Sequence, residues 1–165
     1  MITRILSGGQ TGVDRAALDV AKLLGIPRGG WCPRGRLAED GRIPDRYQLT
    51  ETLSAHYPER TRLNVRDADR TLVLAHPPPL SNGTRLTLRL ARHKPSLLIP
   101  LMSPVPYNEL VRLAREFLVG CETLNVAGPR ESGRPGIYLA AKAFLMEVLR
   151  QQPLQVAEQF ERPGP

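Results

Sequence analysis

The segment with the strongest chemical signal spans residues 7–15 and reads SGGQTGVDR. A short apolar run typical of a strand precedes it at residues 2–6, and apolar residues at helical spacing follow it at residues 16–24. Glycines let a backbone approach a ligand closely, and a helix N-terminus offers free N–H groups and partial positive charge. The pattern predicts an anion site, most often for phosphate, with a purely structural turn capped by Thr11 or Asp14 as the alternative.

This loop differs from the two common phosphate-binding motifs. It lacks the Gly-Lys-Ser/Thr sequence of a P-loop, and its glycine spacing is not that of the dinucleotide fingerprint. The candidate ligand-binding residues here are Gly8, Gly9, Gln10, Thr11, Gly12 and Arg15.

Two further loops follow predicted strands and precede predicted helices. Residues 82–87 read NGTRLT, in which a threonine could cap the helix or contact a ligand oxygen and Arg85 could pair with phosphate. Residues 128–132 read GPRES, where Arg130 could bind an anion, unless the segment is a surface turn closed by an internal Arg–Glu pair. The candidate binding residues of the two loops are Gly83, Thr84, Arg85, Thr87, Arg130 and Ser132.

Two carboxylates are candidates for catalysis if the protein is an enzyme. Asp14 and Glu131 could each polarise a water molecule or stabilise an oxocarbenium-like centre. The three histidines are dispersed and form no recognisable catalytic arrangement with a serine or cysteine.

A long stretch without periodicity, residues 31–50, predicts an irregular loop, and such loops are often functional. Trp31 is the candidate for stacking on a ligand ring, and packing within the loop is the alternative. Its acidic residues have no dedicated metal-binding spacing, so we expect no metal site.

The alternation of predicted strands and helices along the chain indicates the fold that positions these loops. Short apolar strands alternate with helices about five times, which indicates an α/β doubly wound, mainly parallel sheet flanked by helices. Ligands of such sheets lie outside the carboxyl ends of the strands, where the candidate loops occur. We expect a single ligand-binding domain at residues 1–150 and a polar C-terminal tail at residues 151–165.

Composition narrows the class of partner. The 165 residues are 41% hydrophobic and 24% charged, as in one globular domain, and the formal net charge of +7 favours anionic ligands. Aromatic residues make up only 5% and no nucleic-acid motif is present, so we do not expect nucleic acid as the partner. No apolar stretch approaches the length of a membrane helix and no signal peptide is recognisable, so we expect a cytoplasmic protein without a membrane partner.

These motifs together resemble a known family. The runs GGQTGVDRAALDVAKLLGIPRGGWCPRGRLAEDGRIPDRYQLTET, NVRDADRTLVL, NGTRLT, KPSLLIPL and LNVAGPRESGRPGIY are similar to the family of proposed molybdenum carriers. This family is also described as the circularly permuted YpsA-like branch of the SLOG superfamily. The resemblance covers roughly residues 2–150. Its first motif matches Gly8, Gly9, Thr11, Gly12 and Asp14, its second Gly83, Thr84 and Thr87, and its third Arg130 and Glu131.

The resemblance implies a Rossmann-like fold and a pocket for a nucleotide or nucleotide derivative. Phosphoribohydrolases of the superfamily resemble P-G-G-x-G-T-x-x-E with a catalytic Glu, but Thr87 stands at the corresponding offset here and cannot act as a carboxylate. We therefore expect a sensor or carrier of a phosphate-bearing, nucleotide-like or pterin-like ligand, with the molybdenum cofactor or a nucleotide as the candidate cofactor. The alternative is a hydrolase of a nucleotide N-glycosidic or phosphate bond. Because relatives often form dimers or larger assemblies, the resemblance also predicts a homo-oligomer.

Overall fold

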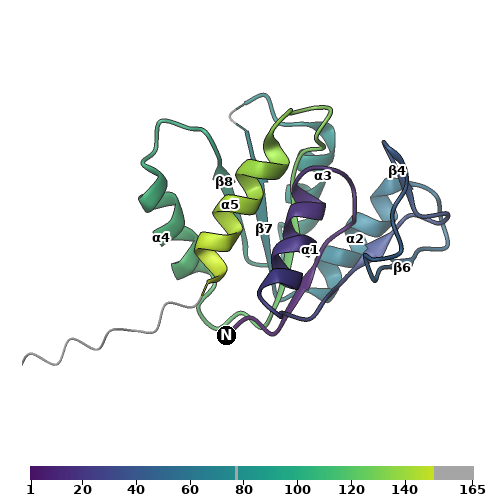
Figure 1. Ribbon diagram of the computed structural model, residues 1–165, viewed down its shortest axis with the longest axis horizontal. Coiled ribbons are helices and arrows are strands. Elements are labelled where there is room, and N and C mark those ends of the chain that lie inside the picture. The colour runs from purple at the N-terminus through teal and green to yellow at the C-terminus, as the bar shows by residue number, and fades with distance from the viewer. Residues whose placement is uncertain (77, 151–165) are drawn as a thin grey trace, which may run out of the picture.

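A five-stranded, fully parallel sheet forms the centre of the molecule (Figure 1). The computed structural model describes residues 1–76 and 78–150, so the predicted tail at residues 151–165 lies outside the described residues. The strands lie in the order β2-β1-β9-β7-β8. Their bounds are Arg4–Leu6 for β1, Arg28–Gly29 for β2, Arg70–Ala75 for β7, Ser96–Pro100 for β8 and Thr123–Ala127 for β9.

Helices cover both faces of this sheet. The helices α1, α4 and α5 pack side by side on one face, and α2 and α3 pack against each other on the opposite face (Figure 1). Right-handed crossovers account for α1 and α4 on one face and α2 and α3 on the other, because the two pairs connect strands in opposite directions along the sheet. The last helix, α5, packs between α1 and α4. The bounds are Val13–Leu23 for α1, Tyr57–Asp67 for α2, Asn82–Ala91 for α3, Tyr107–Phe117 for α4 and Ile137–Leu149 for α5.

The hydrophobic core explains why the strands are apolar without strict alternation. In β7, the residues Thr71–Ala75 are all buried, since side chains on both faces of the strand meet a helix layer. The larger core cluster fills the space between the sheet and the layer of α1, α4 and α5. The α/β doubly wound fold expected from the sequence is confirmed.

The segment at residues 31–50 differs from the expected irregular loop. It contains the two-residue strands β3 (Trp31–Cys32), β4 (Leu37–Ala38) and β5 (Gly41–Arg42), and β6 (Thr50–Glu51) ends it. β4 and β5 pair as an antiparallel hairpin, and β3 pairs with β6 in parallel. Strands this short leave no hydrophobic periodicity, so the sequence alone gave no sign of them.

Within residues 1–76 and 78–150, no helix is both long and apolar enough to cross a membrane.

Candidate functional site

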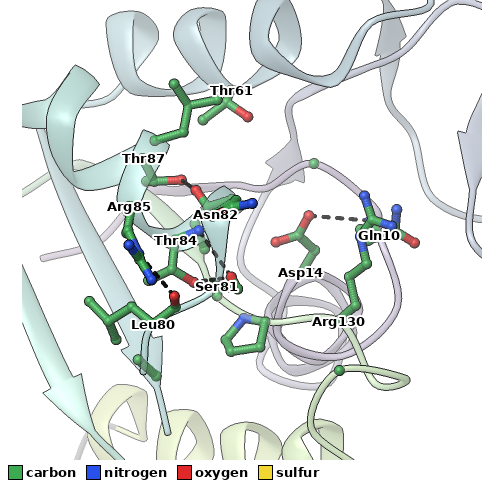
Figure 2. Close-up of a pocket in the computed structure, with 18 of the residues that line it drawn as sticks. Gln10, Asp14, Thr61, Leu80, Ser81, Asn82, Thr84, Arg85, Thr87 and Arg130 are labelled. Atoms are coloured by element: carbon green, nitrogen blue, oxygen red, sulfur yellow. Dashed lines mark hydrogen bonds between the residues drawn. The ribbon is translucent and has the colours of Figure 1, made fainter. Parts of the chain in front are cut away.

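A cavity of about 570 Å³ opens at the carboxyl ends of the central strands (Figure 2). Its lining includes residues that follow β1, β7 and β9, together with side chains from α2 and α3. This volume falls within the roughly 300–1,000 Å³ typical of small-molecule sites. The structure brings into this one cavity the predicted binding residues Gly8, Gln10, Gly83, Thr84, Arg85, Thr87, Arg130 and Ser132, and the carboxylate candidate Asp14.

One side of the cavity is formed by the start of α3. Ser81 is the N-cap, and its Oγ accepts a hydrogen bond from the Thr84 N–H at 3.2 Å and lies 2.9 Å from the Thr84 Oγ1. Thr87 donates its hydroxyl to the Gly83 carbonyl at 3.0 Å, which holds the first turn closed. The N–H groups of the first helical residues have no intrahelical acceptors, so this end of the cavity presents donors and partial positive charge.

The opposite side contains a buried ion pair between α1 and α2. The Arg60 Nη1 donates to the Asp14 Oδ2 at 2.7 Å, and the two side chains are 15% and 5% exposed. The backbone at Gly8 leaves the space that Arg60 occupies, because a Cβ at position 8 would lie 1.4 Å from the Arg60 Nη1. A larger residue at position 8 would therefore displace the end of a side chain that lies 52 residues further along the chain.

The charge of the lining favours an anionic ligand. Four arginines contribute to it, and Asp14 is the one acidic residue among the described lining residues. Two of the guanidinium groups, those of Arg60 and Arg130, lie 5.8 and 4.9 Å from the centre of the Tyr57 ring. The other two lining arginines are Arg85 and Arg134.

A carboxylate of the protein itself occupies the space beside the Gly-rich loop. Glu39, at the tip of the β4–β5 hairpin, accepts hydrogen bonds from the hydroxyls of Thr11 and Ser132 and from the Ser132 N–H. Gly12 is the N-cap of α1 and has no side-chain cap hydrogen bond, so the alternative of a cap by Thr11 or Asp14 is not what the structure shows. Glu39 thus lies beside Thr11, and the Val13 N–H at the start of α1 donates to the Pro129 carbonyl, whereas the start of α3 lines the cavity.

The hydrogen bonds of the Glu39 carboxylate to Thr11 and Ser132, here called the carboxylate bridge, can be tested by lowering the pH. Burial raises the pKa of Glu39, but the hydrogen bonds from Ser132 and Thr11 outweigh it and leave the pKa below its ordinary value of 4.5. A carboxylate whose pKa is lower in the folded state than in the unfolded state stabilises the fold at pH values above the unfolded pKa. This contribution is lost as the pH falls through the lowered pKa of the folded state. At pH 7 we expect Glu39→Gln to lower the melting temperature by about 2 °C, a small effect because the group is exposed.

The difference between wild type and Glu39→Gln should shrink below about pH 4.5 when melting is followed by circular dichroism. Glu122→Gln, an exposed change just before β9, is the control and should show no such difference. A constant gap between Glu39→Gln and wild type from pH 7 to pH 3 would contradict the bridge.

Other predicted site residues lie outside the cavity lining. Gly9 packs against Leu49 and Ile43, where a Cβ would lie 2.4 Å from the Leu49 Cδ1. Arg15 donates to the Gly9 carbonyl and pairs in bidentate fashion with Asp40. The residues outside the lining are Gly9, Thr11, Gly12, Arg15, Trp31 and Glu131.

Trp31 and Glu131 have structural partners. The Trp31 indole donates to the Asp67 carboxylate at 2.7 Å, and its backbone N–H donates to the Asn64 amide oxygen. Both carboxylate oxygens of Glu131 accept backbone N–H groups at the start of α5, from Gly136 and Tyr138. These contacts favour a packing role for Trp31 and a helix-capping role for Glu131.

The second helix supplies lining residues that the sequence analysis missed. Tyr57, Arg60, Thr61 and Asn64 all line the cavity and recur at the i, i+3, i+4, i+7 spacing of one helix face. The sequence signal that could have revealed these residues is a polar helix face at this spacing, but such faces are usually exposed to solvent. Asn125, buried in β9, is a further lining residue that was not predicted.

No group of three or more His, Cys, Asp or Glu side chains suited to a metal ion occurs within residues 1–76 and 78–150. The two cysteines, Cys32 and Cys121, are free thiols buried outside the cavity lining, and burial raises the pKa of each.

Comparison with known proteins gives a consistent family assignment. The sequence profile of the circularly permutated YpsA SLOG family matches residues 5–149. A crystal structure from Syntrophus aciditrophicus SB, of a protein with the provisional name of molybdenum carrier protein, is similar at 45% sequence identity with a TM-score of 0.85. The match covers 90% of this chain and 95% of that chain. No curated protein matches, and neither finding favours the hydrolase alternative. The chain belongs to the circularly permuted YpsA family of the SLOG superfamily.

Proposed function

We propose that this protein binds a phosphate-bearing small molecule, nucleotide-like or pterin-like, in the cavity and acts as its carrier or sensor. The observation that carries the proposal is the start of α3, whose N–H donors open into a cavity lined by four arginines and one carboxylate. Phosphate binds favourably where helix N-terminal donors and guanidinium groups converge.

The provisional name of the Syntrophus protein makes the molybdenum cofactor a candidate ligand for this chain. The residues present fit the phosphate of such an organic cofactor through α3 and the arginines. In this proposal the protein holds the ligand through its phosphate, and a nucleotide would bind at the same place.

A thermal-shift screen tests the proposal. The panel contains inorganic phosphate, AMP, ADP, ATP, NAD, cyclic nucleotides, a phosphorylated pterin, molybdate and tungstate. A ligand at 100 times its Kd stabilises by about 2.7 kcal/mol, which shifts the melting temperature of a domain this size by roughly 5–10 °C. Native mass spectrometry of the purified protein would detect a ligand that co-purifies, and it would also test the predicted homo-oligomer.

Matched arginine variants on α3 locate the binding. Arg85 lines the cavity, and Arg89 lies one turn further along the same helix, exposed and outside the lining. Arg85→Ala should weaken binding of a phosphate-bearing ligand by about tenfold, and Arg89→Ala should leave it unchanged. Equal effects of the two variants, or no shift with any phosphate-bearing ligand, would argue against the proposal.

A further inference from the structure

The side of the cavity formed by α1 and α2 contains two buried hydrogen-bond donors without partners. Gln10 is 4% exposed, and its amide Nε2 has no partner among the described residues. The Nε of Arg60, also buried, has none either. Leaving a buried donor unpaired is destabilising, and both residues line the cavity, so a partner entering from the cavity would remove this cost.

The orientation of the Gln10 amide is fixed by its neighbours. The Gln10 Oε1 accepts the N–H of Thr11 at 3.1 Å and the N–H of Glu39 at 2.9 Å. Two backbone donors require an oxygen at this place, so the atom left without a partner is the nitrogen. The loop therefore presents a donor here rather than an acceptor.

Asp14 supplies an acceptor beside these donors. Its Oδ2 accepts hydrogen bonds from the Gln10 N–H at 3.2 Å and from the Arg60 Nη1 at 2.7 Å. Figure 2 shows the Asp14 carboxylate between Gln10 on one side and the Ser81–Thr84 cluster on the other. Its second oxygen, Oδ1, has no hydrogen bond within the part of the chain that the structure describes.

The charge at this end of the cavity differs from the charge at α3. The Arg60 guanidinium is balanced by the Asp14 carboxylate and the Gln10 amide is neutral, while the exposed Arg130 adds a positive charge beside Tyr57. A phosphate placed here would meet the Asp14 carboxylate, which repels it, whereas the start of α3 offers donors without a carboxylate. The two ends therefore select different chemical groups of one ligand.

We infer that Gln10, Asp14 and Arg60 form a second subsite, which binds a neutral ligand group carrying a hydrogen-bond acceptor next to a donor. The acceptor takes the N–H of Gln10 or Arg60, and the donor meets the Asp14 carboxylate. A sugar hydroxyl and the lactam edge of a guanine or pterin ring both have this chemistry. The inference rests on the proposed function, which places the phosphate of the same ligand at α3.

Access to this subsite requires a side chain to move, because the two unpaired nitrogens are closed to solvent. Arg130 is exposed, and its guanidinium shares the Tyr57 ring with Arg60, so it lies at this end of the cavity. An exposed cation–π contact is weak, so displacing Arg130 costs less than pairing the two buried donors gains.

Gln10→Glu is the variant that tests the subsite. It keeps an oxygen for the N–H groups of Thr11 and Glu39 but replaces the Nε2 donor by an acceptor. The matched control is Gln48→Glu, the same change at an exposed position outside the lining. Binding of inorganic phosphate, GMP, AMP, 2′,3′-dideoxy-GMP and a phosphorylated pterin would be measured by calorimetry for both variants and wild type.

For wild type we expect at least one organic phosphate to bind about tenfold or more tightly than inorganic phosphate. Gln10→Glu should abolish this advantage, which is the ratio of the two affinities and is compared within each variant, while Gln48→Glu leaves the ratio unchanged. AMP binding as tightly as GMP, with loss in the dideoxy compound, would assign a hydroxyl. Tight binding of GMP, its dideoxy form or the pterin, but not AMP, would assign a lactam.

Two results overturn the inference while leaving the proposed function standing. One is that the wild type binds no organic phosphate more tightly than inorganic phosphate. The other is that Gln10→Glu still binds the organic phosphate more tightly than inorganic phosphate, by the same factor as wild type. If instead neither inorganic phosphate nor any organic phosphate binds, both the proposed function and the inferred subsite are wrong.

Discussion

Replacing Arg60 by methionine should lower the free energy of unfolding by about 3 kcal/mol, because it leaves the carboxylate of Asp14 without its counter-ion. The Asp14 side chain is only 5% exposed, so water can replace the guanidinium only in part. Methionine keeps the length and apolar contacts of the arginine stem, which isolates the electrostatic part of the effect. Urea unfolding followed by circular dichroism measures the change.

The double variant Asp14→Asn/Arg60→Met is the control for this interpretation. It removes both charges together, and an asparagine oxygen can still accept the Gln10 N–H. We expect it to be more stable than Arg60→Met alone, since the unpaired buried carboxylate is gone. A double variant that is less stable than the single one would contradict the prediction.

Gly128→Ala should destabilise the protein by about 2–3 kcal/mol and weaken ligand binding as well. A Cβ at this position would lie 2.2 Å from the Leu74 carbonyl oxygen and 2.5 Å from the Val13 Cγ2. The carbonyl belongs to β7, an interior strand of the sheet, so the loop after β9 must move instead. That loop carries Arg130 into the cavity, which couples stability to binding in this variant.

Gly133→Ala provides a control in the same loop. A Cβ at position 133 would lie 3.7 Å from the nearest atom, the Arg130 carbonyl oxygen, which is an ordinary contact. We expect a change within about 0.5 kcal/mol for this variant. Similar melting temperatures for Gly128→Ala and Gly133→Ala would show that the close approach at Gly128 is not required.

The loops that line the cavity could be predicted because each follows a strand. In a parallel sheet all strands end at the same edge, so any loop that follows a strand must lie near the others. Residues after β1 and β9, such as Gln10 and Arg130, therefore line the same cavity although 120 positions separate them. Predicting at which edge of the sheet these loops lie required only the order of strands and helices along the chain.

The side chain that lies beside the Gly-rich turn could not be predicted in the same way. The Gly-rich turn has the local sequence of a phosphate loop, but Glu39 from the β4–β5 hairpin hydrogen-bonds Thr11 beside it. The local sequence predicts the conformation of the turn, but it does not predict which side chain from another segment packs against the turn. The two-residue strands that build this hairpin leave no periodic pattern to reveal it.

The sequence by itself determined the α/β class, the parallel sheet and the edge at which a ligand would bind. These follow from local periodicity and from the handedness of strand crossovers, which depend little on individual side-chain contacts. Only the tertiary structure decided that Arg60 of α2 pairs with Asp14, and that Trp31 packs against α2 outside the cavity. Such contacts join residues far apart in the chain, and their partners are fixed by how the helices pack on the sheet.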